Sequence, residues 1–175
     1  MDALEPSGRS AIVIRAMLPS GLEALRRRHV TDAEDGMPAH VTLLYPFAQP
    51  DAIEVGVRES LALIAARHPA WRMRLVAQAR WPDTRYATVE PDVPVRALQA
   101  DLAAAFPSLP LYGRPAPFEF VPHVTIAEGP GVDDPAVGRD PAWHELPVSF
   151  TVDAIELFVA LAGTWRSEDR FMLGG

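Results

Sequence analysis

The chain has 175 residues, of which 49% are hydrophobic and 22% are charged, so it is long and apolar enough to bury a core. Its formal net charge is −7, which argues against a protein that grips duplex DNA through a basic surface. The absence of cysteine and lysine excludes disulfides, thiol nucleophiles and Schiff-base amines.

Strand-like and helix-like segments alternate along the chain. Short apolar or alternating runs predict strands, and apolar residues spaced three and four apart predict helices. In chain order we expect a strand at 11–14, a helix from Leu22 to His29, a strand at 40–47, a helix capped by Asp51 with Ile53, Val57, Leu61 and Ile64 on one stripe, a hairpin of strands at 71–79 and 86–90, a helix with Val95, Leu98, Leu102 and Phe106, a strand at 118–127, and a final antiparallel pair at 148–160 and 166–173.

Three further segments are expected to be irregular or solvated. The predicted loops cover residues 31–38, the proline-rich stretch 107–117, and the Gly-, Pro- and Asp-rich stretch 129–147. The basic run 26–29 closes the first helix, where positive charge meets unpaired carbonyls, so we expect it to lie in solvent.

One tripeptide pattern occurs twice, as His40-Val41-Thr42 and as His123-Val124-Thr125. In an extended strand, side chains two apart point to the same face, so each strand displays an imidazole beside a hydroxyl, with an apolar row behind. Strand parity adds Leu44 to the first histidine face, and it places Tyr45 and Phe47 with the core.

Two histidines on facing strands form a general acid and base pair, because imidazole titrates near neutrality. Each neighbouring threonine hydroxyl can donate to a phosphate oxygen held between the strands. No metal or cofactor is required, and we expect none. The alternative is that each histidine is structural, that threonine is simply a good strand former, and that the repeat arises by chance or by an old duplication.

The two motifs resemble the signature of the 2H phosphoesterase superfamily, which includes the 2'-5' RNA ligase-like proteins and cyclic phosphodiesterases. The resemblance extends to the trailing Pro46-Phe47 of the first strand, to Pro122 before the second histidine, and to a central hairpin at 71–91. It implies an α+β fold: one bilobal domain over residues 1–175, with duplicated β-α-β-α-β units whose antiparallel sheets form a central cleft.

The resemblance also implies the chemistry. His40 and His123 would hydrolyse a 2',3'-cyclic or related RNA-type phosphodiester, one activating water and the other protonating the leaving ribose oxygen, while Thr42 and Thr125 hold the phosphate. Which histidine takes which role stays open. Family members often carry a basic residue where this chain has Glu128, and strand parity predicts that Glu128 lies outside the cleft.

Two other residues are candidates for substrate binding. Tyr86 could stack on a base, or it could pack within the hairpin. Arg114 could reach a phosphate, or it could be a solvated loop residue.

The expected partner is a small nucleotide or an RNA end with a cyclic phosphate. A nucleotide-binding or regulatory module that uses the same cleft without chemistry is the alternative, and RNA ligation through the same groups is a further possibility. We expect a cytoplasmic monomer, because the sequence has no heptads, no large apolar stripes and no apolar run of about 18 residues or more.

Overall fold

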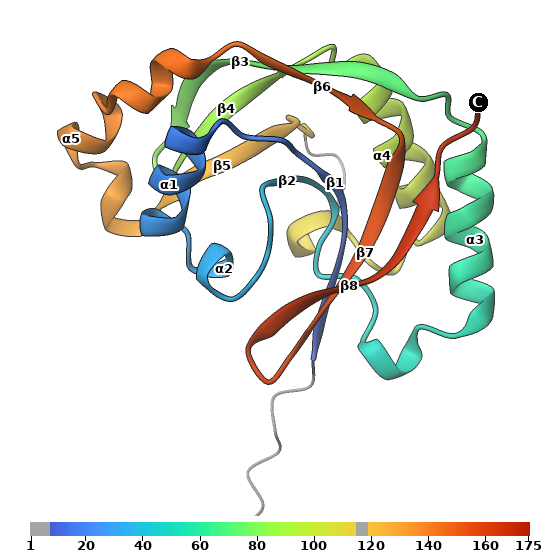
Figure 1. Ribbon diagram of the computed structural model, residues 1–175. Coiled ribbons are helices and arrows are strands. Elements are labelled where there is room, and N and C mark those ends of the chain that lie inside the picture. The colour runs from blue at the N-terminus through green and yellow to red at the C-terminus, as the bar shows by residue number, and fades with distance from the viewer. Residues whose placement is uncertain (1–7, 115–118) are drawn as a thin grey trace, which may run out of the picture.

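The computed structural model describes residues 8–114 and 119–175, so the ends of the predicted loop at Pro117 and of the predicted strand at Phe118 fall outside it. Figure 1 shows a strongly curved sheet with helices packed against it. The strands are β1 (Arg9–Arg15), β2 (His40–Leu44), β3 (Trp71–Trp81), β4 (Thr84–Glu90), β5 (His123–Glu128), β6 (Val148–Val152), β7 (Ala154–Leu161) and β8 (Thr164–Met172). The helices are α1 (Ser20–His29), α2 (Thr31–Glu34), α3 (Val55–Ala66), α4 (Val93–Ala105) and α5 (Pro135–Gly138), with 3-10 turns at 50–52, 111–113, 129–132 and 141–145.

The eight strands found in the described residues form one antiparallel sheet, in the order β6-β3-β4-β5-β2-β1-β7-β8. This order is symmetric about the contact between β2 and β5, because β1 flanks β2 as β4 flanks β5. The predicted α+β fold with duplicated units and antiparallel pairing is confirmed. The expectation of separate sheets is corrected, because the two halves join through the pair Val41–Val124.

The helices differ from the predictions mainly at their ends. The second predicted helix begins at Val55, and Asp51 lies in a preceding 3-10 turn without capping it. A short helix, α2, occupies the first half of the predicted loop 31–38, and the rest of that segment is irregular. In the basic run that ends α1, Arg27 and Arg28 are exposed as expected, but Arg26 is only 2% exposed. Within the described ranges, no helix is both long enough and apolar enough to cross a membrane.

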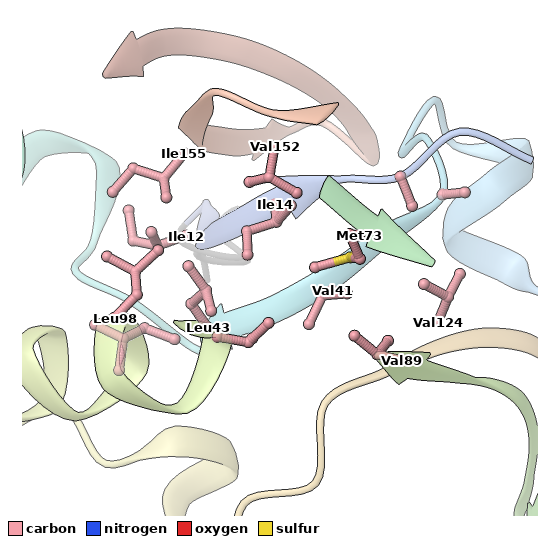
Figure 2. Close-up of a cluster of buried hydrophobic side chains, with 14 of the residues drawn as sticks. Ile12, Ile14, Val41, Leu43, Met73, Val89, Leu98, Val124, Val152 and Ile155 are labelled. Carbon is pink, nitrogen blue, oxygen red and sulfur yellow. The ribbon is translucent and has the colours of Figure 1, made fainter. Parts of the chain in front are cut away.

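The larger of two buried hydrophobic clusters lies on the face of the sheet that the helices cover, and a smaller one packs Ala11 and Val13 of β1 around Trp165. Figure 2 shows the centre of the larger cluster, which strand residues such as Ile12, Val41 and Met73 share with Leu98 of α4. Helix α1 comes just before β2 in the half of the chain that contains it, but packs against β5. Helix α4 belongs to the half that contains β5, but packs against β2. Each helix therefore supports the motif strand of the opposite half.

The carboxyl-terminal third is more regular than predicted. Residues 129–147 fold into α5 and two 3-10 turns, and Trp143 anchors them by burying its ring and donating from Nε1 to the Val137 carbonyl at 2.9 Å. The predicted strand 148–160 divides at Asp153 into β6 and β7. The predicted final hairpin is confirmed as β7 and β8, with Gly163 at φ 78° in its turn.

Candidate active site

The two motif strands are neighbours at the centre of the sheet. β2 and β5 run antiparallel and pair through Val41 and Val124, whose side chains are fully buried on the core face. Continuing this register places each motif histidine across from the threonine of the other motif. The opposite face of the sheet, called the motif face below, therefore gathers four polar side chains: His40, Thr42, His123 and Thr125.

A β-bulge follows the threonine in β2, where the register with β1 skips Leu43. One extra residue turns the side chains that follow it to the other face. Leu44, predicted beside the histidine, is instead fully buried in the core. Tyr45, predicted in the core with Phe47, packs instead against the smaller buried cluster, with its ring 6.3 Å from that of Trp165. Phe47 is buried in the core as predicted.

A bulge at the same place in β5 overturns the prediction for Glu128. The register with β4 skips Ile126, so that Glu128 pairs with Thr84 on the same face as the pair Thr125–Tyr86. Glu128 therefore lines the cleft described below, rather than lying outside it. Its Oε1 accepts a hydrogen bond of 3.3 Å from the backbone N–H of Thr31.

The two histidine rings are held in the same way. Nδ1 of His40 lies 2.8 Å from the carbonyl oxygen of Pro38, and Nδ1 of His123 lies 2.8 Å from that of Val121. Since a carbonyl can only accept, Nδ1 must carry the proton in both rings. In the neutral form each Nε2 is then a free acceptor, which is the state a general base requires.

Both histidines are biased toward the neutral form. Burial lowers the pKa of His40 to about 4, and the nearby positive charges of Arg26 and of a protonated His123 act in the same direction. Burial also lowers the pKa of His123. A bound phosphodiester would favour protonation of both rings, because its negative charge lies beside them.

A cleft of about 810 Å³ opens on the motif face beside His123 and Thr125. Trp81 forms one wall, with its ring 4.7 Å from His123 and 4.2 Å from Tyr86. The other lining residues are Pro82, Asp83, Thr84, Tyr112, Arg114, Glu119, Phe120, Val121 and Glu128.

The two candidate binding residues lie in different settings. Arg114 lines the cleft, close enough to Tyr112 for their charges to interact. Tyr86 is only 8% exposed and lies behind Trp81, 5.4 Å from the ring of His123. Trp81 is thus the aromatic side chain of this hairpin that meets the cleft.

Several lining residues were missed by the sequence analysis, among them Trp81 and Tyr112. Trp81 pairs with Thr84 in register with the pair Ala79–Tyr86, so strand parity could have placed it on the same face as Tyr86. Tyr112, whose pKa is raised by burial against a smaller lowering by the neighbouring Thr42 hydroxyl, follows from no pattern in the sequence, because it lies in a 3-10 turn of the proline-rich connection. In the part of the chain that the structure describes, no three acidic or histidine side chains gather as a metal-ligand set.

The lowered pKa of His40 makes the protein less stable in acid. The unfolded chain takes up a proton near pH 6.5, whereas folded His40 takes it up only near pH 4, so stability is lost as pH falls through this window. The expected loss from this residue is about 3 kcal/mol at pH 4 relative to pH 7. Urea unfolding of the wild type and of His40→Gln at both pH values isolates it: the variant should lose less stability, and equal losses would contradict the lowered pKa.

Comparison with known proteins agrees with the fold. The 2'-5' RNA ligase superfamily matches residues 15–164. Two proteins named "Putative phosphoesterase", from Geobacillus kaustophilus and Geobacillus thermodenitrificans, are each 28% identical over 144 residues, covering 79% of this chain and 80% of their own.

Solved structures share the architecture at low identity. The TT0787 protein of Thermus thermophilus is 18% identical with a TM-score of 0.58, and Escherichia coli LigT complexed with 3'-AMP is 18% identical with a TM-score of 0.56. Both comparisons cover 95% of this chain and 98% of the other. The extent of the family match, over most of the sequence, shows that this chain belongs to the 2'-5' RNA ligase superfamily of 2H phosphoesterases.

Proposed function

We propose that this protein is a metal-independent phosphodiesterase that hydrolyses 2',3'-cyclic or related RNA-type phosphodiesters. The observation that carries the proposal is the pair of imidazoles on adjacent strands, each with Nδ1 fixed by a carbonyl and Nε2 left to act, and each beside a threonine hydroxyl. A nucleotide-binding site needs no second imidazole held in this way.

In the proposed reaction, Nε2 of one histidine takes a proton from water, and the water oxygen attacks the phosphorus. The bond from phosphorus to one ribose oxygen breaks, and Nε2 of the other histidine, protonated, gives its proton to that oxygen. The hydroxyls of Thr42 and Thr125 donate to the phosphate oxygens, where negative charge grows. Ligation is the reverse, with a ribose hydroxyl in place of water, and uses the same groups.

The charge of the cleft favours a small substrate. Among the described residues that line it, the carboxylates of Asp83, Glu119 and Glu128 outnumber the guanidinium of Arg114, so additional phosphates of a longer substrate would be repelled. Escherichia coli LigT, which shares the fold, has been crystallised with 3'-AMP, with ATP and with NADP+. A mononucleotide or a short RNA end therefore fits the proposal better than a long polynucleotide.

The test is turnover of 2',3'-cyclic mononucleotides and short oligonucleotides with EDTA present, with the position of the product phosphate determined by NMR. We expect hydrolysis that the chelator does not reduce, faster for mononucleotides. Binding of a nucleoside monophosphate is measured by calorimetry on the same preparation. Tight binding without turnover of any cyclic phosphate would replace the proposed enzyme with a nucleotide-binding module.

Trp81 is expected to hold the base of the substrate. Its ring meets the cleft and is supported from behind by Tyr86. Since stacking of one base on an aromatic ring contributes about 1–3 kcal/mol, Trp81→Ala should raise KM for a cyclic purine nucleotide about tenfold or more, and Trp81→Phe should restore most of it. A base-free cyclic phosphodiester provides the control: if its KM rises equally, Trp81 does not act by stacking.

A further inference from the structure

The chain segment before each motif histidine is tied to a helix by an arginine. On the first side, Nη2 of Arg26 in α1 donates to the Met37 carbonyl at 2.8 Å. The next carbonyl, of Pro38, accepts from Nδ1 of His40. The one after it, of Ala39, accepts from the backbone N–H of Ala16, just after β1, at 2.8 Å. Three successive carbonyls are therefore fixed immediately before the histidine.

The second side repeats this arrangement from a different helix. Nη1 of Arg96 in α4 donates to the carbonyl of Phe120, and the next carbonyl, of Val121, accepts from Nδ1 of His123. Both arginines thus bind the carbonyl three residues before a histidine, and both histidines bind the carbonyl two residues before themselves. The two arginines occupy different positions in their helices, so the two sides share the hydrogen bond to the carbonyl and not the place of the arginine in its helix.

The surroundings of the two arginines differ. Arg26 is 2% exposed, and its ion pair with Glu23 is long, at 3.5 Å. Arg96 is 37% exposed, and its Nε lies 2.7 Å from a carboxylate oxygen of Asp92. A buried guanidinium with a distant counter-ion exerts a stronger field on its neighbours than a half-exposed one that is closely paired.

We propose that Arg26 and Arg96 are positioning residues for the two histidines, and that Arg26 also acts on His40 through its charge. By fixing the backbone of each entry segment, the arginine sets the carbonyl that orients the imidazole and directs Nε2 toward the substrate. The charge of Arg26 then opposes protonation of His40. The contribution to turnover rests on the function proposed above, whereas the effect on protonation does not.

Several charged groups face His40, and they must be separated from Arg26. Asp32 of α2 favours the protonated ring, and a protonated His123 of β5 disfavours it. Arg15 of β1 is the register partner of His40, but its guanidinium is bonded to Glu156 through Nε at 2.9 Å and Nη2 at 2.8 Å. The charge of Arg15 is therefore neutralised more closely than that of Arg26, and Arg26 is the arginine whose charge acts on His40.

The test combines NMR titration of the histidine rings with kinetics, in Arg26→Met, Arg26→Lys and Arg96→Met. Arg27→Met is the matched control, because Arg27 is the next residue of the same helix, is 71% exposed and pairs with the same Glu23. In Arg26→Met the midpoint of His40 should rise by about one pH unit. In Arg26→Lys, which keeps the charge, it should stay near the wild-type value. Arg27→Met and Arg96→Met should leave it unchanged.

Turnover separates the positioning role from general damage to the fold. Arg26→Met and Arg96→Met should each lower kcat about 10- to 100-fold with little change in KM, because a small misplacement of a reacting group costs that much. If Arg26→Met does not fold, Arg26→Lys carries the test, with a lowered kcat and an unmoved His40 midpoint. A folded Arg26→Met with the wild-type midpoint and kcat overturns the inference. Failure of the wild type to turn over any cyclic phosphate overturns the proposed function instead, since the titration needs no substrate.

Discussion

Replacing either motif histidine with alanine should lower kcat/KM for a 2',3'-cyclic mononucleotide by about 10²- to 10⁴-fold. The two rings lie on adjacent strands, and the proposed reaction needs a proton to leave water and another to reach the ribose oxygen. Removing one ring blocks one of these transfers, and the reaction needs both. The measurement is initial-rate kinetics over a range of substrate concentrations at constant pH.

His144→Ala is the matched control, because this histidine is exposed in a 3-10 turn away from the motif strands. It should keep the wild-type rate. The His40→Ala, His123→Ala double variant should be little worse than either single one, since groups that act as a unit do not lose rate additively. Circular dichroism must show an intact fold in every variant. A single variant that folds and keeps full activity would falsify the acid-base assignment.

The sequence predicted the structure correctly where buried residues repeat with the period of a strand or a helix. Alternation along His40-Val41-Thr42 and its repeat predicted which side chains share a face, and the valines are buried behind them as expected. The helical stripe of Val95, Leu98 and Leu102 likewise predicted the buried face of α4. Both predictions rest on interactions between near neighbours in the chain, which a sequence displays directly.

Strand parity predicted the wrong face where a β-bulge adds one residue to a strand. The bulges at Leu43 and Ile126 depend on how β1 and β4 pair with the motif strands, so they cannot be predicted from the local sequence. They reverse the faces of Tyr45 and Glu128, which follow the two motif threonines. The contribution of Glu128 to the acidic lining of the cleft, which is one argument for the proposed small substrate, could therefore not be predicted from the sequence.

The distinction between Arg26 and its neighbours was hidden in the same way. A basic run at a helix end is normally solvated, and Arg27 and Arg28 behave so. Arg26 is buried because α1 packs against β5 of the other half, which turns this one side chain toward the Met37 carbonyl. Burial of a single charge within a charged run is a consequence of the fold, and composition alone does not reveal it.

The second large effect is expected from the motif threonines. Thr42→Val and Thr125→Val keep the size and the β-branch but remove the hydroxyl, so each should lower kcat about 10²- to 10³-fold if the hydroxyl stabilises charge in the transition state. KM should change little, since the ground-state phosphate carries less of that charge. Each Thr→Ser variant keeps a donor and should recover most of the loss.

The two threonines should nevertheless differ in how they respond to their neighbours. The hydroxyl of Thr42 lies close enough to the phenol of Tyr112 to influence its pKa, so Tyr112→Phe should lower kcat in the wild type and have no further effect in Thr42→Val. The same Tyr112→Phe change should add independently to Thr125→Val. Thr164→Val, an exposed position at the start of β8, is the control that should leave kcat unchanged. If both motif threonine variants keep wild-type kcat, the hydroxyls do not contact the phosphate, and the histidines alone must account for the rate.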